Sequence, residues 1–369
     1  FLHSTFCLKQ LPFIFCYYII FASTTHFSYF HLKFTLLNRL GFIVLLLFSA
    51  SFASAQDIHW SQFNDNPIFQ NPANTGHFRG DVRFVGNYRD QWRSVTVPFQ
   101  TLNFSVDAKP LTNRDIGYGL MVFHDVVGDR NFRTIEIQGN IAKQFKITAD
   151  SMHTVRAGIN LGMNHRQLNF DKFYFDNQFN GVQFFPSLPT GEVLFSDART
   201  NLNLGAGLTY QYYENERFNI TGGFGFYNIN RPNQGFYGDV IRRDLRFTAF
   251  GKGIYELNYD WDLVPGFQVS VQGKYREIMI GSSVKYTLVN RMGDYKAMYA
   301  GLFYRNRDAA FVSMGMDFQA WFVGVSYDVN FSQLVPASRT RGGIEIAVRY
   351  IMNRFKPKKI VHRICPDYI

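Results

Sequence analysis

The sequence predicts an all-β fold, an outer-membrane transmembrane antiparallel β-barrel of about 14 strands with a short irregular N-terminal segment. The first observation is composition, because aromatic residues make up 18% of the chain while mean hydropathy is only −0.14. The second is an export signal near the N-terminus, and the third is alternation of apolar and polar residues through most of the remaining chain. Many aromatic residues with moderate hydropathy are typical of strands with one apolar and one polar face.

The export signal lies within residues 1–55. Arg39 precedes the apolar run LGFIVLLLFSASF (40–52), and the sequence Ala-Ser-Ala follows at 53–55. A positive residue, a short apolar run and an A-x-A site together describe a secretory signal peptide, and the run is too short to span a bilayer. We therefore expect cleavage after Ala55 and export of the mature chain.

The first residues of the chain are unusual, because residue 1 is Phe and the first Met is Met121. We expect residues 1–37 to be translated upstream sequence, with a true start on a non-Met codon; the alternative is an unusually long signal peptide. In either case the fold is expected to begin after the signal peptide.

The alternating region extends from Val82 to about Met352. In NLNLGAGLTY (201–210), for example, leucines, an alanine and a tyrosine alternate with asparagine, glycine and threonine. Such alternation places one strand face against an apolar medium and the other against water. A soluble sandwich alternates too, but these segments have roughly 9–12 residues, which is the length of a tilted membrane-spanning strand.

About fourteen such segments are expected, and an even number suits a single-chain barrel. Their centres lie near Phe84, Phe104, Leu120, Ile137, Ile159, Leu204, Phe224, Phe250, Val271, Val284, Leu302, Met314, Val325 and Ile346. The longer connections expected between them are 90–99, 124–131, 167–199, 229–242 and 332–341, and the shorter ones include 148–152, 213–217 and 319–320. Since outer-membrane barrels have long loops outside and short turns inside, both termini are expected in the periplasm.

These patterns divide the mature chain into three parts. Residues 56–80 form an irregular plug or docking segment, 81–353 the barrel, and 354–369 a basic periplasmic tail. The segment contains SQFNDNPIFQNPANTG (61–76), in which two Asn-Pro pairs and a closing Gly indicate successive turns. We interpret it as a plug or docking element rather than a mere lead-in to the first strand.

Two further features bear on the lumen. Polar residues at inward positions are expected to line an aqueous pore or to fill a narrow barrel as a polar network: Glu136, Gln138, Asn140, Lys274 and Arg276. The Phe-rich connection 167–200 is long enough to be a lid, a plug or a partner-binding surface, or else a loop that packs on its own aromatic residues.

The sequence contains no recognisable catalytic or cofactor motif. It has no phosphate-binding glycine loop, no H-E-x-x-H and no mature cysteine pair, since Cys365 is the only cysteine after the leader. His153 and His165 are the only strand-placed histidines that a lipase-like site would use, and neither accompanies a serine motif. HDVVGDR (124–130) lacks the order of a calcium loop, so a polar turn is expected there. We therefore predict no enzyme, no cofactor, no metal and no nucleic-acid partner.

Several motifs occur in an order that resembles a known family. They are SQF…NP…NPANTG (61–76), NYRDQW (87–92), PFQTLNFSVD (98–107), DIGYGLMVFHDVVGD (115–129), SYDVNFSQLVPASRTRGGIEIAVRY (326–350) and ICPDY (364–368). This order resembles the PorP/SprF family of type IX secretion system membrane proteins over nearly the whole mature chain. The resemblance implies an outer-membrane barrel that works with the type IX machinery in the periplasm and outer membrane. It also implies secretion or surface attachment of cargo, such as a large gliding adhesin with a C-terminal sorting domain.

The resemblance also implies candidate partner-binding residues. The N-terminal motif and the residues next to it give Gln62, Phe63, Asn66, Pro67, Asn71, Pro72 and Gly76; the Tyr-Arg-x-Gln-Trp element gives Tyr88, Arg89, Gln91 and Trp92; the tail gives Lys358, Lys359, Cys365 and Pro366. The chain departs from the family pattern at its end, Asp367-Tyr368-Ile369, and in its basic stretch 354–363. That stretch either docks an acidic periplasmic partner or is solvated.

Two alternatives stay open from the sequence alone. The Tyr-Arg-x-Gln-Trp element either contacts a partner or belongs to an interfacial aromatic girdle, with Arg89 stacked on Trp92. The whole protein is either a non-catalytic interaction barrel of the secretion and gliding machinery or a passive or hydrophobic-solute channel.

Overall fold

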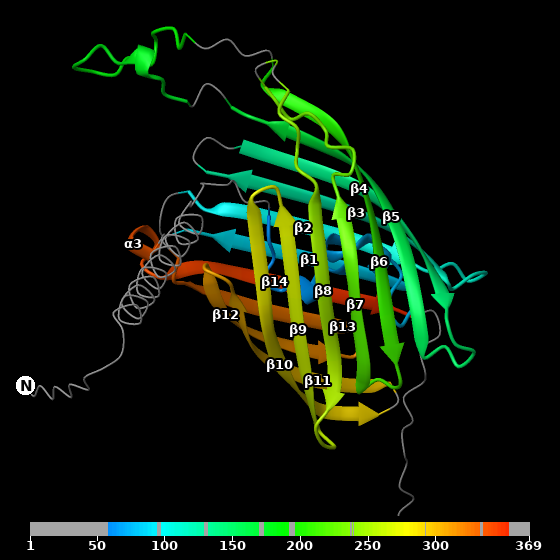
Figure 1. Cartoon of the computed structure of the whole chain (residues 1–369). Coiled ribbons are helices and arrows are strands. Elements are labelled where there is room, and N and C mark those ends of the chain that lie inside the picture. The colour runs from blue at the N-terminus through cyan, green and yellow to red at the C-terminus, as the bar shows by residue number, and fades with distance from the viewer. Residues whose placement is uncertain are drawn as a thin grey trace, which may run out of the picture. The chain divides into compact units, whose positions relative to one another are not determined.

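The computed structural model describes residues 58–93, 97–128, 132–169, 173–191, 196–236, 238, 240–291, 293–332 and 335–353. The expected signal peptide with its cleavage site after Ala55, and the expected tail 354–369, lie outside these residues. Within them, 14 strands form one closed antiparallel barrel, each strand pairing with its neighbours in sequence order (Figure 1). The predicted fold class is confirmed.

The strands are β1 (Val82–Gln91), β2 (Phe99–Ala108), β3 (Ile116–Val127), β4 (Phe132–Lys146), β5 (His153–Gln167), β6 (Ala198–Tyr213), β7 (Phe218–Tyr227), β8 (Arg246–Glu256), β9 (Trp261–Gln272), β10 (Tyr275–Arg291), β11 (Asp294–Arg305), β12 (Ala309–Phe318), β13 (Trp321–Asn330) and β14 (Arg341–Met352). Every centre expected from the sequence falls inside its strand. The barrel closes where β1 pairs with β14, from Val82 opposite Met352 to Gln91 opposite Gly343. Closure leaves no unpaired strand edge.

Apolar and polar side chains lie on opposite faces of the wall. In β13, Val325 and Tyr327 point outward and are 41% and 46% exposed, whereas Ser326 and Asp328 point inward and are 1% exposed. The same alternation runs through the other strands, so the outer face is an apolar belt and the interior is largely polar. This distribution is that of a barrel whose outer face meets lipid.

The two ends of the barrel differ in their connections. One end, called here the long-loop end, has the connections 168–197, 228–245 and 331–340; the opposite end, called the short-turn end, has turns such as 147–152 and 214–217. Three connections at the long-loop end are nevertheless short, 128–131, 273–274 and 306–308. The first was expected to be longer, 124–131, but residues 124–127 belong to β3. The 331–340 connection contains α3 (Val335–Ser338).

The hairpin between β9 and β10 corrects one detail of the sequence interpretation. The turn lies at Gly273-Lys274, so Lys274 does not face the lumen, and Arg276 points outward beside Ile278. Gln272 pairs with Tyr275, and paired residues share a face, so the turn reverses the parity of the alternation. Tyr275 and Glu277 therefore point inward, whereas the other predicted inward residues, Glu136, Gln138 and Asn140, are buried in the interior as expected.

The long connection between β5 and β6 packs on its own aromatic residues in its described part. It contains the short helix η4 (Asp176–Gln178) and an isolated bridge between Phe179 and Phe184. The ring of Tyr174 meets Phe184 edge-on with centroids 4.7 Å apart. These contacts agree with the interpretation of a self-packed loop.

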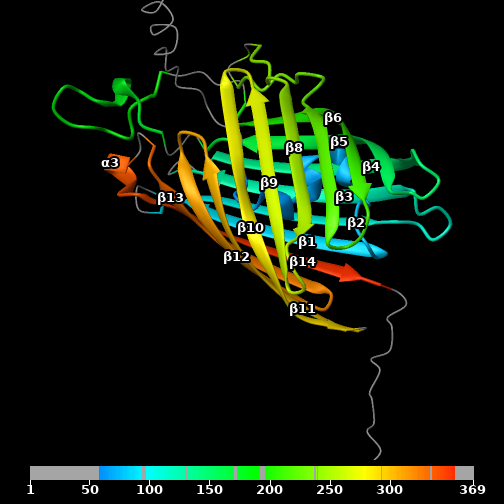
Figure 2. The same ribbon diagram turned by 60° about the horizontal axis from the view of Figure 1, so that its bottom comes forward.

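Residues 58–80, called here the N-terminal segment, lie within the barrel (Figure 2). The segment has three short helices, η1 (Phe63–Asp65), α2 (Pro67–Gln70) and η2 (Pro72–Asn74). The helix η2 contacts β4, β5 and β6, α2 contacts β3, and η1 contacts β14. No helix of the described residues is long and apolar enough to cross a membrane.

Candidate functional site

The two Asn-Pro pairs start two of the three short helices. Pro67 begins α2 and Pro72 begins η2, where the missing N–H of proline costs nothing because the first helical N–H groups have no intrahelical partner. Asn71 caps η2, since its Oδ1 accepts a hydrogen bond from the Ala73 amide at 2.9 Å. The motif therefore encodes a compact, folded-back chain rather than an extended lead-in.

Asn71 also fastens the segment to the barrel wall. Its Nδ2 donates to the main-chain oxygens of Leu208 at 3.1 Å and Phe224 at 2.9 Å, which lie opposite each other on β6 and β7. The side chain is fully buried, with 0% exposure. Both ends of the amide are thus used, one within the segment and one on the wall, and no smaller or apolar residue can replace both functions.

Inward-facing glycines let the backbone of the segment approach the wall closely. A Cβ added at Gly158 of β5 would lie 2.5 Å from the amide nitrogen of Ala73, which is closer than real Cβ contacts. A Cβ at Gly117 of β3 would meet Thr75, and one at Gly207 of β6 would meet Asn71. Glycine within these strands therefore marks close approach of another backbone.

Arginines of the wall bind the carbonyl groups at the end of the segment. Arg156 of β5 donates to the oxygens of Ala73 at 3.2 Å and Thr75 at 2.7 Å. Arg83 of β1 donates to the oxygen of Asn74 at 3.0 Å. These guanidinium groups satisfy backbone acceptors that have left regular structure and are shielded from water.

Asp107 of β2 completes this contact near the short-turn end. Its carboxylate accepts from Arg83 at 2.7 Å and from the backbone amide of Gly76 at 2.7 Å. The carboxylate of Asp107 is fully buried, and each of its oxygens has a donor. The last turn of the motif NPANTG is therefore held by charge-assisted hydrogen bonds.

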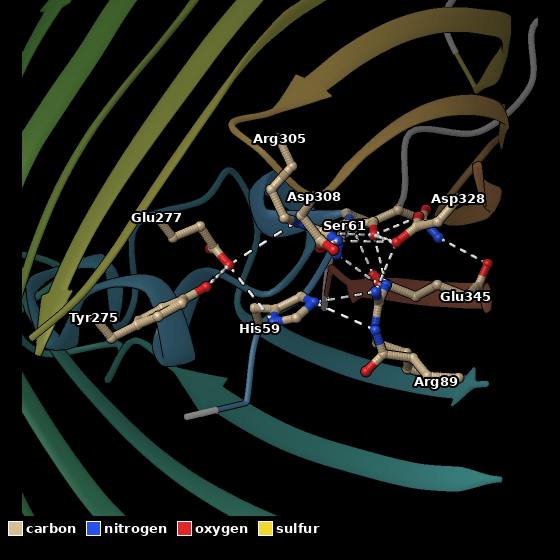
Figure 3. Close-up of polar contacts among 11 residues, drawn as sticks. His59, Ser61, Arg89, Tyr275, Glu277, Arg305, Asp308, Asp328 and Glu345 are labelled. Atoms are coloured by element: carbon tan, nitrogen blue, oxygen red, sulfur yellow. Dashed lines mark hydrogen bonds and ion pairs between the residues drawn. The ribbon is translucent and has the colours of Figure 1, made fainter. Parts of the chain in front are cut away.

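A second and larger polar cluster holds the start of the segment near the long-loop end (Figure 3). Arg89 of β1 pairs with Asp328 of β13 at 2.7 Å and with Glu345 of β14 at 2.8 Å. The Oγ of Ser61 donates to Asp328 at 2.7 Å and accepts from Arg89 at 2.5 Å. Arg305 of β11 reaches the same hydroxyl at 2.7 Å. Ser61 is thus the point where two arginines and an aspartate meet.

Glu345 binds the backbone of the segment as well as Arg89. One carboxylate oxygen accepts from the amide of Ser61 at 2.7 Å, and the other accepts from the amide of Gln62 at 2.9 Å. The side chain of Gln62 in turn donates to the main-chain oxygen of Glu345 at 3.0 Å. A carboxylate that accepts two backbone amides and a guanidinium fixes both the position and the direction of the chain.

His59 and Glu277 extend the cluster toward β10 (Figure 3). Burial, and then the charges of Arg305 and Arg89, lower the pKa of His59 well below its usual range, so the imidazole is neutral. Its Nε2 lies 3.3 Å from Nη2 of Arg89, which can only donate, so the ring proton belongs on Nδ1. Nδ1 faces Glu277 at 3.5 Å, and Glu277 also accepts from the hydroxyl of Tyr275 at 2.7 Å.

Aromatic side chains anchor the middle of the segment. Phe63 meets Phe303 of β11 edge-on at 5.8 Å, and Phe303 stacks on Phe311 of β12 at 5.1 Å. Phe69 packs between Phe123 of β3 and the guanidinium of Arg246, which lies 4.7 Å from its ring centroid. The segment is therefore held by charges near both ends and by ring contacts between them.

The interior beside the segment contains one large cavity and at least two small ones. The large cavity, of about 790 Å³, extends from Phe63 to the short-turn end, where Lys109 and Arg114 line it. The small cavities, both lined by Ile58 and Phe69, hold about 20 Å³ and about 30 Å³. Each of these has room for one or two water molecules. The segment therefore leaves open space mainly toward the short-turn end.

The structure places most of the predicted partner-binding residues inside the chain. Gln62, Phe63, Asn66, Pro67, Asn71, Pro72 and Gly76 are buried among wall residues. Arg89 is fully buried in the ion cluster and does not stack on Trp92, whose ring instead meets Phe99 at 4.7 Å. Gln91 and Tyr88 are half-buried, and Tyr88 bonds Asp90. Lys358, Lys359, Cys365 and Pro366 lie outside the described residues. Contact of these residues with a partner stays a prediction.

Sequence reasoning missed the wall residues that bind the segment. They are Arg83, Asp107, Arg156, Arg305, Asp328 and Glu345, with the glycines opposite η2. Their common signal is a charged residue at an inward position of a strand, and Asp328 and Glu345 lie within the motif 326–350. Among the described residues, no group of three or more His, Cys, Asp or Glu side chains is arranged to hold a metal ion.

The fold and the interior together define a class: a membrane β-barrel whose lumen is occupied by its own ion-paired N-terminal segment. The chain belongs to the type IX secretion system membrane protein PorP/SprF family, whose model matches residues 52–350. No curated protein sequence matches the chain.

Solved structures with a similar barrel include a transporter, a FadL homologue and a hydrocarbon channel. The toluene transporter TodX of P. putida is 13% identical, with a TM-score of 0.46 over 77% of this chain and 92% of that chain. A FadL homologue of Pseudomonas aeruginosa is 12% identical, with a TM-score of 0.43 over 78% and 94% of the two chains. The monoaromatic hydrocarbon channel CymD is 10% identical, with a TM-score of 0.45 over 82% and 96%.

Proposed function

We propose that the protein is a non-catalytic outer-membrane barrel of the type IX secretion and gliding motility machinery. In this role it supports secretion or surface attachment of cargo proteins, including a large adhesin with a C-terminal sorting domain, and docks periplasmic components. The mature chain begins after Ala55, and both termini, with the basic tail 354–369, face the periplasm. The family membership supports a role in the type IX machinery, and the filled lumen supports docking of other proteins rather than conduction of solutes.

The observation that carries the proposal is the attachment of the N-terminal segment at both ends of the barrel. Arg89 and Glu345 bind Ser61 near the long-loop end, and Arg156 and Asp107 bind residues 73–76 near the short-turn end. Breaking these contacts leaves buried charges without partners, which is costly. A lumen filled in this way suits a rigid body that other proteins bind.

The second candidate is a passive or hydrophobic-solute channel, and the large cavity at the short-turn end is the observation in its favour. Planar-bilayer recording of the purified protein separates the two functions. We expect no steady current from the intact barrel and a steady current from a variant lacking residues 61–76, because a barrel of this size without its segment encloses water. Large steady currents from the intact protein would overturn the docking proposal.

Recovery of partners from native membranes tests docking directly. We expect the intact protein to recover type IX subunits or an exported adhesin, and the variant lacking 61–76 to remain a heat-modifiable barrel that recovers neither. Recovery of no such protein by the intact chain would contradict the proposal. Equal recovery by both would return the segment to the status of a structural plug without a docking role.

A further inference from the structure

The large cavity has two chemically different walls. Its aromatic wall comes from β11, β12 and β13 and from the segment: Phe63, Tyr299, Phe303, Phe311 and Phe322. Its basic side comes from the N-terminal segment, from the connection between β2 and β3, and from β4, β8 and β14: Arg79, Lys109, Arg114, Lys146, Lys252 and Arg349. The acidic residues that line the same cavity are Asp65 and Asp115.

Part of this positive charge is balanced and part is not. Arg349 pairs with Asp65 at 3.1 Å, Arg79 with Glu216, and Arg114 with Asp81 at 2.5 Å. Lys109, Lys146 and Lys252 form no ion pair with any described residue. Asp65 lies near Lys252 but is taken by Arg349. The cavity therefore keeps an excess of positive charge, carried by these three lysines.

The cavity also offers unused hydrogen-bonding groups. Oγ1 of Thr154 and Oδ1 of Asn64 are buried, line the cavity and have no hydrogen-bond partner among the described residues. Buried polar atoms are normally satisfied, so these two point to an occupant or to water. Other polar side chains that line the cavity are Gln144, Gln211, Asn219, Thr221, Ser283 and Ser313.

We propose that this cavity is a docking site for an extended acidic segment of a partner protein, which places an apolar side chain against the aromatic wall. This inference rests on the proposed docking function and adds the chemistry of the partner. Carboxylates of the partner's acidic segment meet Lys109, Lys146 and Lys252. The backbone of the partner's segment meets the amide and hydroxyl groups that line the cavity. Charge complementarity of this kind sets partner choice and association rate.

The charge of the chain itself selects among possible occupants. The tail that follows Asn353 contains Arg354, Lys356, Lys358, Lys359 and Arg363 against the single acid Asp367. β14 ends at Met352, at the short-turn end where the cavity is lined by Lys109. A basic tail is repelled by a basic cavity, so the tail adds to the attraction for an acidic partner rather than filling the site.

Peptide binding to the purified full-length protein in nanodiscs tests the proposal. The probe is a short fluorescent peptide rich in glutamate with one phenylalanine. One control peptide has glutamine at every glutamate position, and a second has alanine in place of the phenylalanine. We expect the glutamine peptide to bind at least about tenfold more weakly than the probe, and the alanine peptide to bind more weakly as well. Equal binding of the glutamate and glutamine peptides would overturn the proposal.

Variants of β4 and β8 locate the site. Lys146→Gln combined with Lys252→Gln should lower the affinity for the acidic peptide by about tenfold. The matched control is Lys143→Gln on the same strand, because Lys143 borders the outer wall and not the lumen; it should bind like the parent. Lys146→Gln alone keeps the test valid if the double variant folds poorly, since Lys146 is exposed. An unchanged affinity in both lysine variants would place the peptide elsewhere and overturn the site.

Competition experiments distinguish an acidic peptide from other anions as the ligand of the cavity. We expect inorganic phosphate and oleate to displace the acidic peptide only weakly, because neither supplies both carboxylates along a backbone and a side chain for the aromatic wall. Complete displacement by oleate at the concentration of the peptide would assign the cavity to a lipid and overturn the proposal. A purified protein that binds no acidic peptide, with type IX subunits still recovered from membranes, rejects this site while leaving the proposed function intact.

Discussion

At the scale of single residues, Arg89 connects elements that are far apart in the sequence. It lies opposite Glu345 in the pairing of β1 with β14, so both side chains point inward on the same face. Its guanidinium also reaches Asp328 and the hydroxyl of Ser61. One arginine therefore joins the first strand, the last two strands and the N-terminal segment.

Arg89→Met should lower the free energy of unfolding by about 3–5 kcal/mol, because it leaves the buried carboxylate of Glu345 without its cation and leaves Asp328 with Arg305 alone. Urea titration followed by tryptophan fluorescence measures the change. The control is Arg93→Met, which should cost much less, because Arg93 is 75% exposed and water screens its pair with Asp90. Equal losses in the two variants would contradict a structural role for the cluster.

Gly158 tests the close contact between the segment and the wall. Gly158→Val should displace Ala73 and its neighbours, since even a Cβ there would lie 2.5 Å from the Ala73 amide nitrogen. In a Cys365→Ser, Thr75→Cys background, the buried residue 75 should then become reactive to a water-soluble maleimide. Gly139→Val is the control, because its nearest neighbour is 3.9 Å away on the outward face. A protected thiol in Gly158→Val would show that the segment does not need this contact.

At the scale of elements, the strands could be predicted and the ion cluster could not. Strand positions follow from a local pattern, alternation along one stretch of chain, and all the expected centres lie in strands. Arg89 meets Glu345 only because β1 pairs with β14, and that register joins residues at opposite ends of the sequence. The turn between β9 and β10 was expected near Arg276-Glu277 and lies at Gly273-Lys274, because Tyr275 continues the apolar alternation although the turn has reversed its parity.

The Asn-Pro motif lies between these two cases. The turns of 61–76 were predictable, since proline disfavours helix in the residue before it and asparagine caps short helices. What the motif binds was not predictable, because the receptor consists of inward glycines and carbonyl groups on β3, β5, β6 and β7. Glycine and main-chain oxygen leave no distinctive signal in a single sequence.

The connection between β2 and β3 provides a pH-dependent element at the short-turn end. Burial lowers the pKa of Lys109 to about 8, and the neighbouring charges of Arg114, Arg156 and Arg83 act in the same direction, whereas Asp81 opposes them. Lys109 is charged below this pKa and loses its charge as the pH rises through it. Its attraction for an anion is therefore present near neutral pH and is lost above about 8.

The affinity of the glutamate-rich peptide should therefore fall between pH 7 and pH 9, with a midpoint near the pKa of about 8 of Lys109. Fluorescence anisotropy in nanodiscs across this range measures the change. Lys109→Arg should make this fall in affinity smaller, because arginine at position 109 stays charged throughout. A parent and an arginine variant with the same pH profile would exclude Lys109 as the group responsible.

At the scale of the whole molecule, the distribution of apolar and charged side chains is the reverse of that in a soluble protein. Large apolar side chains such as Leu161 and Leu204 lie outside, while charged residues such as Glu345 and Arg305 are buried inside. The interior is stabilised by paired charges and by the segment, and the exterior requires an apolar solvent. The sequence encodes both requirements in the same alternation, which explains how a chain of moderate hydropathy can belong in a membrane.

The depth dependence of a charge on the outer face tests this arrangement. Leu161 lies near the middle of β5 and is 55% exposed, whereas Ile147, in the turn after β4, is 59% exposed at the short-turn end. Leu161→Arg should lower the free energy of unfolding in lipid vesicles by about 2–4 kcal/mol, and Ile147→Arg by about 0–1 kcal/mol, because the cost of a charge falls from the bilayer centre to its surface. In zwitterionic detergent micelles, which thin and adapt around an arginine, the difference between the two variants should shrink. Equal effects in vesicles would mean that the middle of β5 does not lie at the centre of a bilayer, and would remove the membrane as the reason for the apolar belt.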